Sequence, residues 1–158
     1  MVSLIACVDN ENGIGLNNTI PWSLKPDMKH FREMTMNTTI IMGRRTWESI
    51  GSKPLPNRVN IVVTSNTASV NNCIACVCMA DAIELAQGLL KPIFIIGGTS
   101  MYKEAIPFAS NVYLTRIKNS YNCDTFFPFY SLDRFQCEVG SWDEYNGITY
   151  RFETYTSI

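Results

Sequence analysis

A carboxyl group stands among apolar residues in the segment that surrounds residue 27. Leu24, Met28 and Phe31 recur at helical spacing and define one apolar stripe. Asp27 lies three residues after Leu24 and four before Phe31, so its side chain points along the same stripe. A charged carboxylate on a buried face is costly unless it is paired or hydrogen-bonded. Two interpretations remain open: a first-turn acid that complements the helix dipole, or a pocket acid that binds a protonated or amidine-like ligand group.

Two junctions between a strand and a helix combine residues that suit a phosphate group. Arg44 and Arg45 begin a predicted helix, where cations oppose the helix dipole unless an anion is bound there. Gly97 and Gly98 end an apolar run and would let a ligand approach backbone amides at the next helix. Solvated arginines and a tight turn are the respective alternatives.

A third junction bears on which dinucleotide would bind. The predicted strand over residues 59–63 ends in Thr64 and Ser65 rather than in an acid. Sites that prefer NAD usually place Asp or Glu on the ribose, whereas a phosphorylated ribose is bound by Arg and hydroxyl groups. Taken together, the three junctions favour NADP over NAD.

Three of the six cysteines fall in one short segment, at Cys73, Cys76 and Cys78. A Cys-x-x-Cys pair can bind zinc or carry out redox chemistry. Residues three apart in a strand point to opposite faces, however, and no second Cys-x-x-Cys follows. The only histidine of the chain is His30. We expect reduced, buried strand cysteines and no metal site.

The elements that must position these residues alternate between strand and helix, which is typical of an α/β protein with helices on both faces of a mostly parallel sheet. The C-terminal part differs, because Asn146-Gly147 between two alternating segments predicts an antiparallel hairpin. The expected strands cover residues 2–8, 38–42, 59–63, 74–78, 93–96 and 112–117, and the expected helices cover the Asp27 segment and residues 44–50, 80–90 and 99–106.

Length and composition describe an ordinary globular protein. The chain has 158 residues, 46% of them hydrophobic and 17% charged, with a net charge of −1, so no basic field points to nucleic acid. The apolar run over residues 2–8 is too short to span a membrane and lacks the positive start of a secretory signal. We expect one domain over residues 1–158, a cytoplasmic location and a monomer.

Several motifs at matching separations resemble the dihydrofolate reductase family, and the resemblance extends over nearly the whole chain. It implies a three-layer, eight-stranded sheet and reduction of 7,8-dihydrofolate to 5,6,7,8-tetrahydrofolate with NADPH, by hydride transfer to C6 and protonation at N5. Such an enzyme supports one-carbon metabolism and the synthesis of thymidylate, purines and glycine. The motifs are Ile20-Pro21-Trp22, Asp27 with Phe31, the segment over residues 41–50, Pro54-Leu55-Pro56-Asn57-Arg58 and Ile96-Gly97-Gly98.

The resemblance also implies roles on the substrate side. Asp27 matches the acid that binds the 2-amino group and ring nitrogen of the pterin, and Thr115 matches the hydroxyl that hydrogen-bonds this acid. Trp22 matches an indole that holds an ordered water near the substrate. Arg58 matches the guanidinium that pairs with the glutamate α-carboxylate of the substrate. The apolar walls around the pterin and benzoyl ring match Ile5, Cys7, Met28, Phe31, Ile50 and Leu55.

On the cofactor side, the resemblance implies an adenosine-binding part over residues 38–90 and a mobile lid over residues 10–19. It also implies a cis peptide bond between Gly97 and Gly98. The residues that match NADPH-binding positions are Cys7, Ile14, Gly15, Gly43, Arg44, Arg45, Thr46, Thr64, Ser65, Gly97, Gly98, Thr99, Ser100, Met101 and Tyr102.

Two other functions compete with this interpretation. One is a reductase-like protein that binds ligands or acts as a scaffold without catalysis. The other is a reductase of a different pterin or pyrimidine, as in riboflavin synthesis, for which Arg58 would have no carboxylate to bind.

Overall fold

The computed structural model describes residues 1–158, apart from the side chains of residues 130 and 131. The strands are β1 (Val2–Val8), β2 (Gly13–Gly15), β3 (Thr39–Gly43), β4 (Val59–Val63), β5 (Ile74–Cys76), β6 (Ile93–Gly97), β7 (Ala109–Ile117), β8 (Thr125–Phe126), β9 (Phe135–Val139), β10 (Asp143–Tyr145) and β11 (Ile148–Ser157). The helices are α1 (Lys25–Thr35), α2 (Arg44–Ser49), α3 (Met79–Gly88) and α4 (Thr99–Ala105), with short 3-10 turns η1 (Thr67–Ser69), η2 (Ile106–Phe108) and η3 (Phe129–Leu132).

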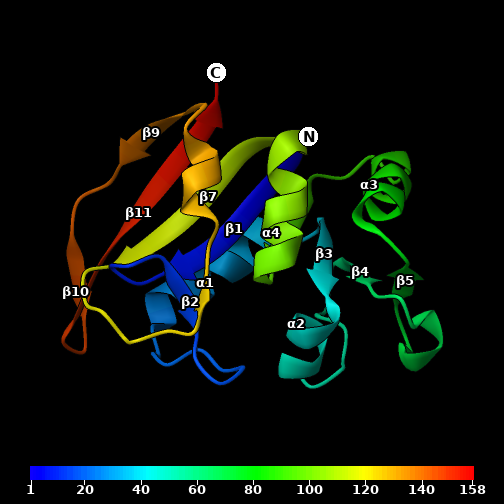
Figure 1. The fold of residues 1–158 in the computed structure, drawn as a ribbon, viewed down its shortest axis with the longest axis horizontal. Coiled ribbons are helices and arrows are strands. Elements are labelled where there is room, and N and C mark those ends of the chain that lie inside the picture. Colours follow the sequence, from blue (N-terminus) through cyan, green and yellow to red (C-terminus); the bar gives the residue numbers. More distant parts are fainter.

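One large sheet forms the centre of the molecule, in the order β10-β11-β7-β1-β6-β3-β4-β5 (Figure 1). The pairs from β7 to β5 are parallel, and β11 pairs antiparallel with β7. The predicted hairpin across Asn146-Gly147 is confirmed as β10 and β11. β9 pairs with the same edge of β11 as β10, so nine segments occupy eight positions across the sheet.

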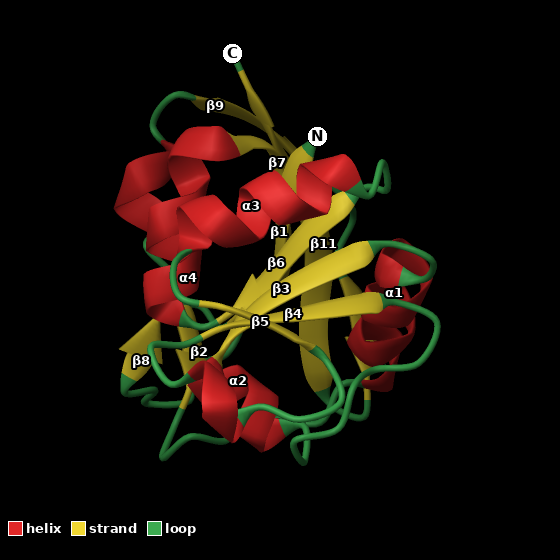
Figure 2. Cartoon of the chain, turned by 90° about the vertical axis from the view of Figure 1, so that its right-hand side faces the viewer, coloured by secondary structure: helices red, strands yellow, loops and turns green.

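Helices cover both faces of this sheet, as the sequence predicts (Figure 2). Alternate residues of β3 belong to different cores because successive side chains of a strand point to opposite faces. Ile40 and Met42 pack on the α1 and α2 side with Trp47, whereas Ile41 packs with residues of α3 and α4. The structure is therefore a sandwich of three layers.

The inward face of α1 differs from the predicted stripe at one position. Leu24 is 2% exposed and Phe31 is half-buried, but Met28 is 64% exposed. Residues 24, 27 and 31 face the sheet, so the inward position predicted for Asp27 is confirmed and the one predicted for Met28 is wrong. On the outer side of the helix, Lys29 pairs with Glu33 at a distance of 3.9 Å.

The cysteine segment is a strand only over its first part. β5 ends at Cys76, which is buried, whereas Cys78 is exposed and directly precedes α3. The prediction of a strand through residue 78 was wrong because α3 begins one residue earlier than the predicted helix. All six cysteines are free thiols.

The described part of the chain has no group of three or more His, Cys, Asp or Glu side chains that could hold a metal ion. None of the described helices has the length and apolar character that crossing a membrane requires.

Substitution of Ile41 tests the central core. Ile41 is fully buried in the middle of β3, so Ile41→Ala should lower the free energy of unfolding by about 2–5 kcal/mol. Ile158→Ala is the matched control because Ile158 is 84% exposed, and it should change stability by less than about 0.5 kcal/mol. Urea denaturation followed by circular dichroism measures both, and equal effects of the two variants would contradict the burial.

Candidate active site

An acid from α1 and a hydroxyl from β7 meet on the inner face of the sheet. Thr115 Oγ1 donates a hydrogen bond of 2.6 Å to Asp27 Oδ1. Pro26 fits the first turn of α1, which sets Asp27 at the start of the helix and against the strand. Burial raises the pKa of the Asp27 carboxyl group, and the bond from Thr115, the charge of His30 and a bond from Cys7 oppose this rise only in part. The sheet thus holds an acid that protonates more easily than a solvated one.

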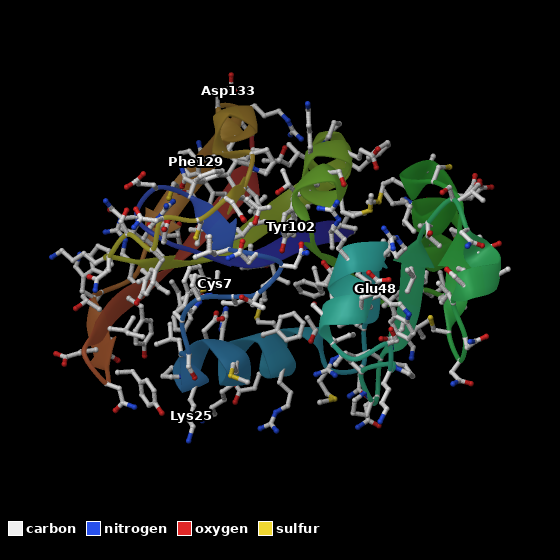
Figure 3. All side chains as sticks on the ribbon, turned by 60° about the horizontal axis from the view of Figure 1, so that its bottom comes forward. Cys7, Lys25, Glu48, Tyr102, Phe129 and Asp133 are labelled. Atoms are coloured by element: carbon white, nitrogen blue, oxygen red, sulfur yellow. The ribbon has the colours of Figure 1, made fainter. Side chains whose placement is uncertain are left out.

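Cys7 lies beside this acid, because it is directly opposite Thr115 in the pairing of β1 with β7. Figure 3 shows Cys7 between the sheet and α1, whereas Lys25 points outward from the helix. Burial and then the charge of Asp27 raise the pKa of the Cys7 thiol well above its usual value, so this thiol stays protonated at neutral pH. Trp22 joins the same cluster and packs its ring 5.2 Å from that of Tyr121.

Four of the predicted wall residues gather in one apolar cluster on the same side of the sheet. Ile5 is buried there, and Phe31, Ile50 and Leu55 are partly buried against it. Met28 is not part of this group, since most of its side chain is exposed. The cluster gives a flat aromatic ligand an apolar surface next to a carboxylate.

Arg58 is held in place by the proline-bearing loop that precedes β4. Its Nε donates to Thr35 Oγ1 and its Nη1 donates to the carbonyl oxygen of Pro56, each at 3.0 Å. The buried side chain of Asn60 bonds both backbone groups of Leu55 and so fixes the loop. The guanidinium lies 6.0 Å from the centre of the Phe31 ring, at the end of α1 away from Asp27. This separation suits a ligand with an aromatic head and a carboxylate tail.

Two glycines allow backbone segments to meet where β3 and β6 end. Gly97 is opposite Met42, and a Cβ added to Gly97 would lie 3.1 Å from Thr46 Oγ1. A Cβ on Gly43 would lie 3.1 Å from Cγ of Met101. Gly97 also has a φ of +134°, which side-chain-bearing residues rarely adopt. The expected cis bond between Gly97 and Gly98 is confirmed.

A hollow of about 350 Å³ opens where β4 ends. Its lining includes the guanidinium of Arg44 and the side chains of Thr64, Ser65 and Asn66. Arg44 also pairs with Glu48 at 3.2 Å, and both side chains are about half exposed. A cation with several hydroxyl and amide groups suits a phosphate ester. Arg45 is exposed near this hollow, at the start of α2.

Residues 99–102 connect the other end of the predicted cofactor site to the core. The Tyr102 hydroxyl donates to the carbonyl oxygen of Ile5 at 2.8 Å, and Met101 is buried. Thr99 Oγ1 donates to the carbonyl oxygen of Phe126 at 2.9 Å, whereas Ser100 is exposed. Strand β1 and α4 are therefore fixed to each other beside the two glycines.

The predicted lid contains a short strand and is attached at its base. β2 pairs with β8, and Gly15 accepts a bond of 3.0 Å from the backbone N–H of Asp124. Ile14 packs against the core on the α3 and α4 side. Residues 16–20 form the outer part of the loop, closed by bonds between Leu16 and Thr19.

Comparisons with known proteins agree with this arrangement. Residues 1–157 match the model of a family described as dihydrofolate reductase. The chain belongs to the dihydrofolate reductase family. A dihydrofolate reductase of Bacillus subtilis is 37% identical over 159 residues, which cover 98% of this chain and 94% of that protein. One from Buchnera aphidicola is 45% identical over 131 residues, or 83% of this chain and 81% of that protein.

A solved dihydrofolate reductase has the same fold. The structure from Enterococcus faecalis, complexed with NADP(H) and RAB-propyl, superimposes with a TM-score of 0.91. The two chains are 32% identical, and the match covers 99% of this chain and 96% of the other. The sheet and helices of this chain therefore all lie within the part that superimposes on a dihydrofolate reductase.

Sequence reasoning missed two buried acids, Glu153 in β11 and, next to the predicted lid, Asp9, which is 1% exposed. Its carboxylate accepts bonds of 2.7–3.0 Å from the backbone N–H groups of Glu11, Gly13 and Tyr121. Burial raises the pKa of Asp9, but these bonds lower it by more. Asp9 thus fastens the base of the lid to the loop after β7. An acid directly after a strand and before an Asn- and Gly-rich loop was the available signal.

The raised pKa of Asp27 has a consequence for stability. An acid whose pKa is raised by folding lowers the free energy of unfolding at every pH at which it is ionised. This loss of stability is absent at low pH, where the acid is protonated in both states, and is complete above the pKa of the folded state. Asp27→Asn should therefore raise the free energy of unfolding at pH 8 by about 1 kcal/mol, because the variant has no charge to bury. Denaturation at pH 8 and pH 4 measures this, and a gain that does not shrink at the lower pH would contradict it.

Proposed function

We infer that this chain catalyses the NADPH-dependent reduction of 7,8-dihydrofolate to 5,6,7,8-tetrahydrofolate, as its family does. The observation that carries the inference is the largely buried carboxyl group of Asp27, bonded to Thr115 beside an apolar cluster. The match to the family over residues 1–157 supports it. The alternative of a non-catalytic binding protein is not favoured, because such a protein has no need of a costly buried acid.

On the substrate side we propose that Asp27 binds the 2-amino group and the neighbouring ring nitrogen of the pterin. A carboxylate presents two acceptors that fit this pair of donors. Arg58 pairs with the α-carboxylate of the glutamate tail, and the nearby charge of Arg32 adds to the attraction. The walls of the site are formed by Ile5, Phe31, Ile50 and Leu55, together with Met28, whose exposed thioether is available to the ligand.

The reaction needs a hydride at C6 and a proton at N5. NADPH supplies the hydride when it is bound. Asp27 favours protonation of the substrate because burial raises its pKa, and Thr115 keeps the carboxyl group oriented. Trp22 holds a water near the substrate in this scheme, and the lid, through Ile14 and Gly15, excludes bulk solvent. The protonated thiol of Cys7 adds no competing charge beside the acid.

The residues at the ends of β3, β4 and β6 fit NADPH. Gly43 and Gly97 let the segments after β3 and β6 pack closely against Met101 and Thr46, which brings the starts of α2 and α4 together for a dinucleotide. We propose that the adenosine phosphate binds in the hollow beside β4, within the adenosine-binding part over residues 38–90, to Arg44, Arg45, Thr46, Thr64 and Ser65. The pyrophosphate and nicotinamide contact Gly97, Gly98, Thr99, Ser100, Met101 and Tyr102, with Cys7 near the carboxamide.

We also propose that the chain acts as a monomeric cytoplasmic unit formed by one domain over residues 1–158. The six free thiols suit a reducing compartment. A net charge of −1 gives no electrostatic reason for binding nucleic acid.

A spectrophotometric assay tests the function directly. NADPH oxidation should require dihydrofolate, and NADH should be a much poorer donor because it lacks the phosphate that Arg44 and its neighbours would bind. Asp27→Asn should lower the rate at pH 7 by two or more orders of magnitude, as expected when a general acid is lost. A wild-type chain that binds both ligands but transfers no hydride would refute the proposal.

Arg58 distinguishes dihydrofolate from other pterins and pyrimidines. Arg58→Ala should raise the KM for dihydrofolate about 10- to 100-fold, the usual loss for a charge-assisted hydrogen bond, with a small effect on kcat. Lys53→Ala removes an exposed cation from the same loop and should have little effect. If Arg58→Ala leaves the KM for dihydrofolate unchanged, the substrate has no tail at this position.

A further inference from the structure

His30 lies one helical turn after Asp27, on the side of α1 that meets the sheet. Its imidazole stacks on the ring of Phe152, with the centroids 4.2 Å apart and the planes at 30°. Phe152 in β11 is directly opposite Thr115 in β7, and Thr115 donates its hydroxyl proton to Asp27. Asp27 and His30, one turn apart on α1, thus contact Thr115 and Phe152, which are paired on adjacent strands. The stack on Phe152 keeps the imidazole on the same side of the helix as the acid.

The surroundings of His30 contain other titratable groups. Glu33 on α1 acts on the imidazole in addition to Asp27, and Lys29 is turned outward to pair with Glu33. On β11, Tyr150 contacts Phe152 with a ring distance of 5.7 Å, and Asp143 of β10 lies opposite Tyr150.

The remaining charges of β7 and β11 lie elsewhere. Arg116, Arg151 and Glu153 occupy the alternate positions of these strands and form ion pairs on the opposite face of the sheet. Cys7, next to Asp27, remains a neutral thiol. A proton on His30 is therefore the change of charge that Asp27 experiences most directly between about pH 5 and pH 7.

We propose that His30 is a positioning residue for the acid: its protonated imidazole holds the Asp27 carboxylate in the ionised form and so limits protonation of the acid at low pH. The catalytic consequence rests on the proposed function, but the coupling of the two side chains does not. Burial lowers the pKa of His30, while the charge of Asp27, and then that of Glu33, opposes the decrease. The charge of His30 in turn lowers the pKa of Asp27 against the effect of burial.

The coupling makes a distinct prediction for the pH dependence. Above the pKa of His30 the imidazole is neutral and Asp27 responds only to burial and its hydrogen bonds. As the pH falls, His30 gains a proton and stabilises the Asp27 carboxylate, so the acid protonates over a lower range than it would beside a neutral residue. The wild-type enzyme should resemble a neutral variant at high pH and a permanently cationic variant at low pH.

Proton NMR tests the coupling without any catalysis. The chain has a single histidine, so the imidazole resonances of His30 are unambiguous. Titration of the wild type and of Asp27→Asn should show a lower pKa for His30 in the variant, because the variant lacks the carboxylate that favours the imidazolium. Equal titration curves in the two folded proteins would overturn the proposal, whatever the activity of the chain.

Single-turnover rates of hydride transfer test the consequence. The rate of His30→Gln relative to wild type should rise by up to about threefold between pH 8 and pH 5.5, as a weak, partly screened ion pair is removed. His30→Lys should shift the profile in the opposite direction, to lower pH. Lys25→Gln is the matched control, since it removes an exposed cation that points outward from α1, and its ratio to wild type should stay flat.

These outcomes separate an electrostatic role from a structural one. Loss of packing against Phe152 would slow His30→Gln and His30→Lys alike and leave the ratios to wild type independent of pH. Parallel profiles of this kind would overturn the proposal. Should catalysis be absent in the wild type, the NMR titration still decides whether the two side chains are coupled.

Discussion

The contact between the Asp27 carboxyl group and the Thr115 hydroxyl is the constraint on which the site depends. It joins the first turn of α1 to β7, and it supplies the hydrogen bond that makes a buried acid tolerable. Because the bond comes from a neutral hydroxyl, it orients the carboxyl group without fixing its charge. An ion pair with a buried arginine would have kept the carboxylate ionised and removed its value as an acid. The ionised form of Asp27 therefore remains unfavourable, and the carboxyl group stays available as an acid.

The parallel order of the sheet brings the remaining functional residues together. The ends of β3, β4 and β6 lie at one edge of the sheet, so that glycines and hydroxyl groups distant in sequence come together where we propose that the dinucleotide binds. The row formed by Cys7, Thr115 and Phe152 crosses three strands on the face covered by α1. The proposed substrate and cofactor sites thus share one sheet, and the predicted lid over residues 10–19 is a separate segment beside it.

Much of the fold and of the site could be predicted because the signals were local. The strands at Val2–Val8 and Val59–Val63 follow from apolar runs, and Asn146-Gly147 marks the hairpin. Spacing predicts the inward orientation of Asp27 correctly, but it also places Met28 on the same stripe, and Met28 is exposed. The partner of Asp27 could not be predicted, because Thr115 lies 88 residues away in the sequence. The stack of His30 on Phe152 depends on a pairing between distant segments, for which one sequence contains no signal.

The attachment of the lid by Asp9 has a consequence for how this protein can evolve. The carboxylate of Asp9 fastens the segment up to Gly13. Asp124 fastens the next part, because its backbone N–H donates to the carbonyl oxygen of Gly15 and its carboxylate accepts from the backbone N–H of Asn17. Asn18 and Thr19 at the tip are exposed, and the hydrogen bonds of Thr19 return to Leu16 within the same turn. Mutational drift, including insertions and deletions, is tolerated there at little thermodynamic cost. The length of the tip can therefore diversify among descendants while the acid beneath it keeps its geometry.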